Sequence, residues 1–201
     1  KNKPKFSQVF SKNSALNYLS VARMCLFASR DVWFVVALPV YLSSRFEWQH
    51  EFIGAFMASW IIGYGIVQSL APKVITKAKR RIPDGAMLWG WGNLLALSTL
   101  VLAAAIHYLP FPEVGIVIGL LVFGGIFAIN SSLHSYVIVA MAREDGVSMD
   151  VGFYYMANAL GRLLGTILSG WIFQLYGMVT CLLISAILAL LAAFYIRKVD
   201  V

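Results

Sequence analysis

The stretch FASRDVWF, residues 27–34, places Arg30 and Asp31 side by side within an apolar run that extends from residue 16 to residue 42. In a soluble helix such a pair would be an ordinary polar turn. In the middle of a membrane-spanning helix each ionised group costs about 3 kcal/mol or more, so it requires a partner or a polar cavity. A second arginine, Arg162, lies in a later apolar run of the same kind. We interpret these charges as groups that belong to a polar pathway across a membrane.

The composition supports a membrane location for the whole chain. Hydrophobic residues make up 60% of the 201 residues and charged residues only 12%, and the mean hydropathy is +0.78. Soluble globular domains carry roughly 25% charged residues. Several apolar windows reach the length of about 20 residues that a helix needs to cross the hydrocarbon core. The sequence therefore predicts an all-α membrane protein with several transmembrane helices.

Six transmembrane helices are predicted, in an order that divides into three plus three. The predicted spans are residues 14–42, 52–71, 85–108, 114–142, 151–176 and 178–196. Pro39 is expected near the far end of the first span, and Pro72 is expected to end the second span before a basic loop, residues 73–81. Inverted repeats of three helices are the construction of each half of a major facilitator transporter. Residues 1–13 are predicted to be a cytoplasmic linker, 14–196 a six-helix transmembrane domain and 197–201 a cytoplasmic tail.

The distribution of basic residues predicts the orientation of these spans. Of the sixteen lysines and arginines, twelve fall on the side of the amino terminus and one, Arg45, on the other side. The remaining three lie within spans. Cytoplasmic loops carry an excess of Lys and Arg, so we expect both termini in the cytoplasm and a multi-pass protein of the inner membrane.

The fifth predicted span has a polar face. Its polar side chains recur at steps of three or four residues, which places them on one side of a helix: Tyr154, Asn158, Arg162, Thr166 and Ser169. Gly161 and Gly165 form a GxxxG pair that would let the backbone of a neighbouring helix approach closely. A packing face without further function explains Thr166 and Ser169 well. It explains Arg162 poorly, because packing alone does not satisfy the five donors of a guanidinium.

In the first span, Arg23 and Arg30 share a face, and Arg23 is close enough to the cytoplasmic edge to extend its charge to the interface. Asp31 points about 100° away from Arg30 on a helix, so the two are not expected to face each other. We expect Asp31 to pair with Arg162 on another helix, which would leave Arg30 free for an anion. The alternative is an ion pair with a purely structural role.

Further polar residues lie in the second and fourth spans. Asn130 and His134 lie about one helical turn apart in the fourth span, and Gln68 lies in the second span. His134 and Asp31 are the intramembrane side chains that titrate nearest to neutral pH, so they are candidates for ion pairing or proton coupling. The candidate substrate-binding residues are Arg30, Arg162, Asn158, Tyr154, Asn130 and Gln68. The third and sixth spans are nearly featureless and are expected to face lipid.

Other classes of function have little support. Cys25 and Cys181 lie inside apolar runs and are expected to be small buried hydrophobic residues rather than a disulfide or a metal site. The basic residues lie in loops without interleaved aromatics, which argues against nucleic-acid binding. Motifs of metalloproteases and serine hydrolases are missing. We therefore expect no enzymatic activity and no cofactor.

Three phrases carry a resemblance to a known family: ASRDVWFVV at residues 28–36, GYGIVQSLAP at 63–72 and YMANALGRLLGT at 155–166. With them the chain resembles the carboxy-terminal half of a major facilitator transporter and, more narrowly, the ArsJ family of organoarsenical exporters. The similarity covers most of the chain, and the first two phrases are its specific part. The basic loop at 73–81 lacks the Gly and Asp of the usual facilitator loop signature.

The resemblance implies export of 1-arseno-3-phosphoglycerate, which a partner glyceraldehyde-3-phosphate dehydrogenase forms from arsenate. It also implies an amino-terminal six-helix half of the same transporter as a partner. Arginine suits such a cargo because its planar fork binds phosphate-like oxyanions in a bidentate manner. Two other functions stay open: export of drugs or other metabolites, and a six-helix membrane scaffold that transports nothing.

Overall fold

The computed structural model describes residues 14–79, 84–141 and 147–199, including all their side chains except those of 72–79 and 147–149. The described residues form six helices: α1 (Ser14–Phe34), α2 (Ala37–Phe46), α3 (His50–Lys79), α4 (Gly85–Tyr108), α5 (Pro112–Met141) and α6 (Val147–Ile196). The predicted linker 1–13, the end of the predicted basic loop and the last two residues of the predicted tail lie outside the described residues. The all-α prediction is confirmed for the described part.

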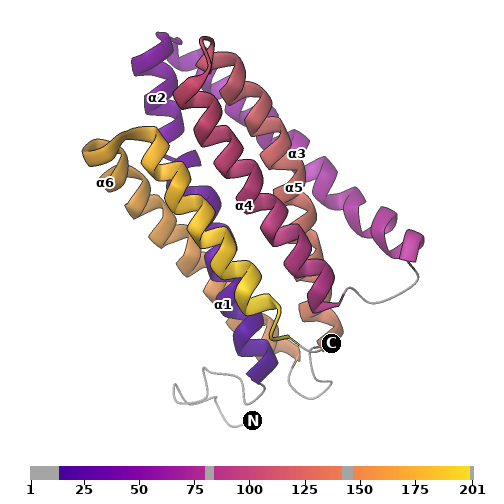
Figure 1. Ribbon diagram of the computed structural model, residues 1–201. Helices are drawn as coiled ribbons and strands as arrows, with labels where there is room; N and C mark the ends of the chain where they lie inside the picture. The colour runs from indigo at the N-terminus through magenta and orange to yellow at the C-terminus, as the bar shows by residue number, and fades with distance from the viewer. Residues whose placement is uncertain (1–13, 80–83, 142–146, 200–201) are drawn as a thin grey trace.

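Five helical segments are long and apolar enough to cross a membrane: Ser14–Phe46, His50–Ala71, Gly85–Tyr108, Pro112–Met141 and Asp150–Ile196. The last one, of 47 residues, is interrupted at Gly177, whose φ of 76° and ψ of −176° reverse the chain. Glycine adopts this φ without the steric cost that a Cβ would add. Figure 1 shows the two arms of α6, 147–176 and 178–196, running side by side. The predicted count of six separate spans is thus not confirmed, because the turn at Gly177 joins the last two into one segment.

The first predicted span, 14–42, falls within the apolar segment Ser14–Phe46, but it is not one continuous helix. It breaks at residues 35–36 into α1 and α2. Pro39 explains the position of the break, since a proline lacks the N–H that would bond to the carbonyl four residues earlier and its ring clashes with that carbonyl, which belongs to Val35. The free amide at the start of α2 is satisfied from another helix: Ala37 N–H donates to Ser169 Oγ of α6 at 3.0 Å.

The second predicted span, 52–71, agrees with the apolar segment His50–Ala71, but the helix that contains it is longer. The backbone of α3 continues helically past Pro72 to Lys79, so most of the predicted basic loop is helix. Proline at 72 leaves the carbonyl of Gln68 without its usual helical partner. Ser132 Oγ of α5 donates to this carbonyl at 3.2 Å. A hydroxyl of a neighbouring helix therefore replaces the lost bond, which is one way for a membrane helix to tolerate an internal proline.

The helix α1 is largely buried and contacts α6 more extensively than any other helix. The small-residue row predicted on α6 is confirmed as the contact. A Cβ added at Gly161 would collide with the backbone carbonyl of Met24, and one added at Gly165 would lie 2.9 Å from the carbonyl oxygen of Ala28. The second arm of α6 packs against α4, where Gly92 meets Ala193. In Figure 1, α3 packs beside α5 and diverges from the bundle toward its carboxyl end.

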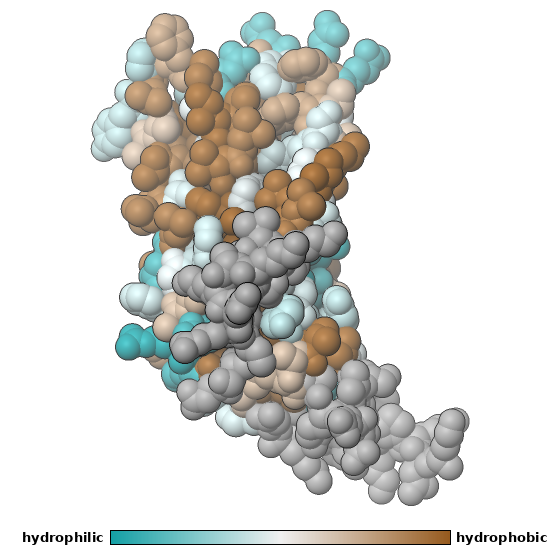
Figure 2. All heavy atoms as spheres, turned by 90° about the vertical axis from the view of Figure 1, so that its right-hand side faces the viewer, coloured by the Kyte–Doolittle hydropathy of each residue, from teal (hydrophilic) through white to brown (hydrophobic). Residues whose placement is uncertain are grey.

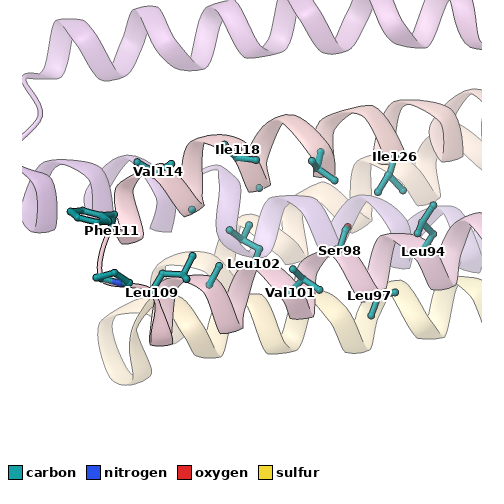
Figure 3. Close-up of a pocket in the computed structure, with 15 residues that line it drawn as sticks. Leu94, Leu97, Ser98, Val101, Leu102, Leu109, Phe111, Val114, Ile118 and Ile126 are labelled. Atoms are coloured by element: carbon teal, nitrogen blue, oxygen red, sulfur yellow. The ribbon is translucent and has the colours of Figure 1, made fainter.

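The exterior of the bundle is largely apolar. Figure 2 shows a broad band of hydrophobic side chains, with hydrophilic residues gathered at the upper edge of this face and again in its lower part. A groove of about 600 Å³ runs between α4 and α5, where apolar side chains from the two helices face each other (Figure 3). None of the side chains that line this groove is charged. The groove is therefore unsuited to an ionic ligand.

Candidate functional site

Asp31 is the centre of the ionic cluster in the bundle. Its side chain is 1% exposed, and its two oxygens contact different arginines. Arg30 Nε lies 2.6 Å from Oδ1, and Arg162 Nε of α6 lies 3.4 Å from Oδ2. The predicted pair between Asp31 and Arg162 is confirmed. The close approach of α1 and α6 at Gly165, where a Cβ would lie 2.9 Å from the Cβ of Asp31, brings the two helices together at this level.

Two expectations about Arg30 are wrong. Arg30 does contact Asp31, although successive helical residues point in different directions, because the arginine side chain is long enough to fold back around the helix. For the same reason Arg30 is not free of a protein partner. Its side chain is 11% exposed, whereas that of Arg162 is 58% exposed. Arg162 is thus the more accessible of the two guanidinium groups.

Aromatic rings flank the guanidinium of Arg30. Its Cζ lies 5.0 Å from the ring centroid of Phe27 on α1 and 5.2 Å from that of Phe127 on α5. The two rings contact each other edge-on, with centroids 5.3 Å apart. A cation over an aromatic face gains about 0.5–2 kcal/mol, more when water is excluded. The rings therefore hold the guanidinium in place on its apolar side.

Arg23 is buried, which corrects the expectation that it extends to the membrane interface. It is 3% exposed, and its Nη1 donates to the carbonyl oxygen of Ser131 on α5 at 2.8 Å. Gln68 of α3 reaches the same turn, where its Nε2 lies 3.3 Å from Ser131 Oγ. Tyr154 of α6 is fully buried, with its ring centroid 5.1 Å from Arg23 Cζ. Residues from four helices thus meet around Arg23.

The remaining candidates separate into two groups. Asn158 lies on α6 between Tyr154 and Arg162, half-buried, and its Oδ1 has no hydrogen-bond partner among the described residues. His134 is 2% exposed, and within the described part of the chain its Nδ1 has no hydrogen-bond partner either. Asn130 faces the other way: its Nδ2 donates to the carbonyl oxygens of Trp91 on α4 and of Ile126, both at 3.0 Å. Asn130 therefore ties α5 to α4 and is not brought together with the arginines.

The polar face of α6 is confirmed as a face toward α1 and α2. Tyr154 contacts Arg23, Arg162 contacts Asp31, and Ser169 contacts the start of α2. Thr166 bonds to the carbonyl of Arg162 in its own helix at 2.8 Å, which is a structural role. The spacing of Phe27 predicted its ring on the same face of α1 as Arg23 and Arg30, but sequence reasoning missed the ring of Phe127. The position of Phe127 along the chain carries no signal, because this ring meets Arg30 only when α1 packs on α5.

Metal chemistry has no basis in the described residues. Within 14–79, 84–141 and 147–199, no group of three His, Cys, Asp or Glu side chains could hold a metal ion. Cys25 and Cys181 are free and buried, as predicted. What this site can do is electrostatic: two guanidinium groups share one carboxylate. The cluster keeps one excess positive charge near the middle of two long apolar segments.

Fold and site together define a multi-pass helical membrane protein with a charged cluster inside its bundle. The family described as the Major Facilitator Superfamily matches residues 10–200. The chain belongs to this superfamily, whose members are typically transporters rather than enzymes. No curated protein matches the chain.

Proposed function

We propose that the chain is the carboxy-terminal half of a major facilitator exporter for a small organic anion, and that the anion is 1-arseno-3-phosphoglycerate. The complete protein would then confer arsenate resistance. In this proposal the two arms of α6 are separate spans, so that six helices form two groups of three. An amino-terminal half with six further helices completes the pathway.

The main support for this proposal is the excess positive charge of the Arg30–Asp31–Arg162 cluster. Arg30 is the midpoint of the segment Ser14–Phe46, and Arg162 lies near the middle of the first arm of α6. A charge at such a depth is costly unless it is compensated. One carboxylate compensates one arginine, so the second guanidinium calls for an anion. Arg162, with 58% of its side chain exposed, is the group best placed to meet it.

The chemistry of arginine favours an oxyanion as that ligand. Two parallel N–H groups of a guanidinium match two oxygens of a phosphate or arsenate group, and such charge-assisted pairs are roughly twice as strong as neutral hydrogen bonds. Asn158, Tyr154 and Gln68 are proposed as further polar contacts to the cargo. Asp31 and His134 are proposed for ion pairing or proton coupling. The identity of the cargo as an organoarsenical rests on the sequence resemblance described above.

The proposed orientation follows from the charges of the loops. The start of α1 lies beside the end of α6, where the rings of Tyr18 and Tyr195 stack with centroids 6.3 Å apart. The start of α4 lies at the same end, with Gly85 close to the carbonyl of Val199. Most of the basic residues of the sequence flank these ends. By the positive-inside rule we place this end, and both termini, in the cytoplasm of an inner-membrane protein.

Arsenate resistance in cells tests this function. The full-length protein and its partner dehydrogenase are expressed in a host that lacks its own arsenate efflux. We expect Arg162→Ala to abolish resistance, because the cargo loses its accessible guanidinium, and Arg30→Ala to do the same. Growth in arsenate is the measurement, with the amount of transporter in the membrane determined in parallel.

Arg45→Ala is the matched control. Arg45 is an exposed arginine near the end of α2, away from the cluster, and its replacement should leave resistance unchanged. Export that persists in both cluster variants, at normal expression, would show that these arginines do not bind the cargo. Resistance that requires no dehydrogenase would instead point to inorganic arsenate or to another metabolite as the cargo.

A further inference from the structure

Two cations lie at one end of the bundle, where the second arm of α6 ends. Arg197 and Lys198 directly follow Ile196, the last residue of that helix, and both are exposed. Neither cation forms a salt bridge with any carboxylate that the structure describes. Asp84, the exposed cap at the start of α4, instead accepts a hydrogen bond from its own helix, from Met87 N–H. Within the described ranges, both charges therefore stay uncompensated.

Aromatic rings from three helices flank the two cations, at the lower end of the bundle in Figure 1. Arg197 Cζ lies 5.4 Å from the ring centroid of Trp89 on α4. Lys198 Nζ lies 4.5–5.9 Å from three further ring centroids, those of Phe194, Tyr195 and, on α1, Tyr18. A ring face attracts a cation electrostatically and thereby holds it in position. Because a guanidinium has five donors and an ammonium three, both groups keep donors for an anion.

Exposed apolar stripes lead along the membrane-spanning segments to these cations. On the second arm of α6 the stripe consists of side chains three or four residues apart that are 44–56% exposed: Leu183, Ile187, Leu190 and Phe194. Lys198 Nζ lies at the end of this stripe, 4.5 Å from the ring centroid of Phe194. On α4, the exposed side chains of Leu97 and Trp89 lead to Arg197 in the same way. Trp and Tyr settle at the headgroup level of a bilayer, so the order of apolar stripe, aromatic rings and cation matches the order of parts in a phospholipid.

We propose that the end of α6, together with the starts of α1 and α4, binds an anionic phospholipid. Its phosphate accepts hydrogen bonds from Arg197 and Lys198, as charge-assisted pairs, and its acyl chains lie along the apolar stripes of α6 and α4. Basic residues next to a membrane span attract anionic headgroups. A zwitterionic headgroup suits the site less well, because its ammonium would add a third positive charge. A soluble phosphate compound would gain nothing from the stripes. The proposal does not depend on the cargo, and requires only that the protein lies in a bilayer.

Competition for photo-cross-linking in the detergent-purified full-length protein tests this lipid site. The probe is phosphatidylglycerol with a diazirine in its acyl chain, and the readout is labelling of the peptide that contains residues 183–194. Unlabelled phosphatidylglycerol or phosphatidylcholine with the same acyl chains is added as the competitor. We expect phosphatidylglycerol to halve the labelling of the wild type at a concentration roughly tenfold lower than phosphatidylcholine does. The double variant Arg197→Gln, Lys198→Gln should lose this difference, whereas Arg197→Lys, Lys198→Arg should keep it because both charges remain.

Arg45→Gln is the matched control, since Arg45 is exposed near the end of α2 and its replacement should leave the difference between the two lipids intact. Glycerol 3-phosphate, a headgroup without acyl chains, should not compete. Competition by this compound at the concentration of phosphatidylglycerol would show a site for soluble phosphates and overturn the lipid assignment. A double Gln variant that keeps the difference would overturn the role of the two cations, and so would a wild type that shows no difference. These outcomes leave the proposed cargo untouched, because the Arg30–Asp31–Arg162 cluster lies near the middle of its segments and not at the end of α6.

Discussion

At the scale of the residue, a single carboxylate organises the charges of this bundle. Asp31 is 1% exposed and contacts arginines of two helices, one in its own helix and one in α6. Removing one partner from a buried ion pair is more damaging than replacing the whole pair, because the remaining charge is left without compensation. The carboxylate is therefore the member on which the stability of the cluster depends most.

We predict that Asp31→Asn lowers the free energy of unfolding by about 3–5 kcal/mol, the usual cost of a buried charge that loses its partner. We expect this loss of stability to appear as a lower midpoint of thermal unfolding of the detergent-purified full-length protein. Adding Arg30→Met to the variant should restore part of the loss, since it removes one uncompensated cation. Asp84→Asn is the control, because Asp84 is an exposed cap whose Oδ1 accepts from Met87 N–H at the start of α4, and asparagine caps a helix as well as aspartate does. Equal midpoints for Asp31→Asn and the wild type would rule out a stabilising role of the carboxylate.

The pairing of Asp31 with Arg162 was predictable from the sequence, because a charge in an apolar segment needs a partner and few were available. The contact between Arg30 and Asp31 was not predictable from helical geometry, which fixes the direction of Cβ but not the path of a long side chain. The burial of Arg23 was missed for a related reason. Its acceptor is a backbone carbonyl of α5, and every residue type carries such a carbonyl.

At the scale of the element, two prolines show that the position of a helix end depends on hydrogen bonds from neighbouring helices. Pro39 breaks the first span, and Ser169 of α6 satisfies the exposed amide of Ala37. Pro72 does not end α3, and Ser132 of α5 satisfies the carbonyl of Gln68. Sequence position alone gave the opposite expectation for both prolines. The serines that decide the outcome lie on helices far away in the chain, so local patterns could not reveal them.

The sequence predicted that a neighbouring helix approaches α6 closely, since GxxxG marks a close helix approach. It did not predict that this neighbour is α1. We predict that Gly161→Ala lowers the thermal midpoint of the full-length protein, because the added methyl group would collide with the carbonyl of Met24 and force the helices apart. Overpacking of this kind costs about 1–3 kcal/mol.

Gly152→Ala in the same helix is the matched control. A Cβ at Gly152 meets no atom within 4 Å, and alanine in a helix is favoured over glycine by roughly 0.5–1 kcal/mol. Its midpoint should stay the same or rise. A Gly161→Ala protein as stable as the control would show that the two helices are not in close contact at this level.

At the scale of the whole molecule, the apolar groove and the charged cluster lie in different parts of the bundle. The groove between α4 and α5 is lined without any charged side chain, whereas the arginines gather where α1, α5 and α6 meet. The composition predicted this membrane fold well, because length and hydropathy fix where helices cross. It could not predict the geometry of the cluster, which depends on how the helices pack.

The flux of the anionic cargo through the reconstituted full-length protein tests the central claim most directly. Inside-out vesicles accumulate arsenic while the dehydrogenase, supplied with NAD+ as the oxidant, forms the organoarsenical from arsenate and glyceraldehyde 3-phosphate outside. We predict that Arg162→Gln lowers the initial rate by at least tenfold and that Arg162→Lys, which keeps the charge but not the bidentate fork, falls between it and the wild type. Arg162→Gln vesicles that accumulate arsenic at the wild-type rate would contradict the account.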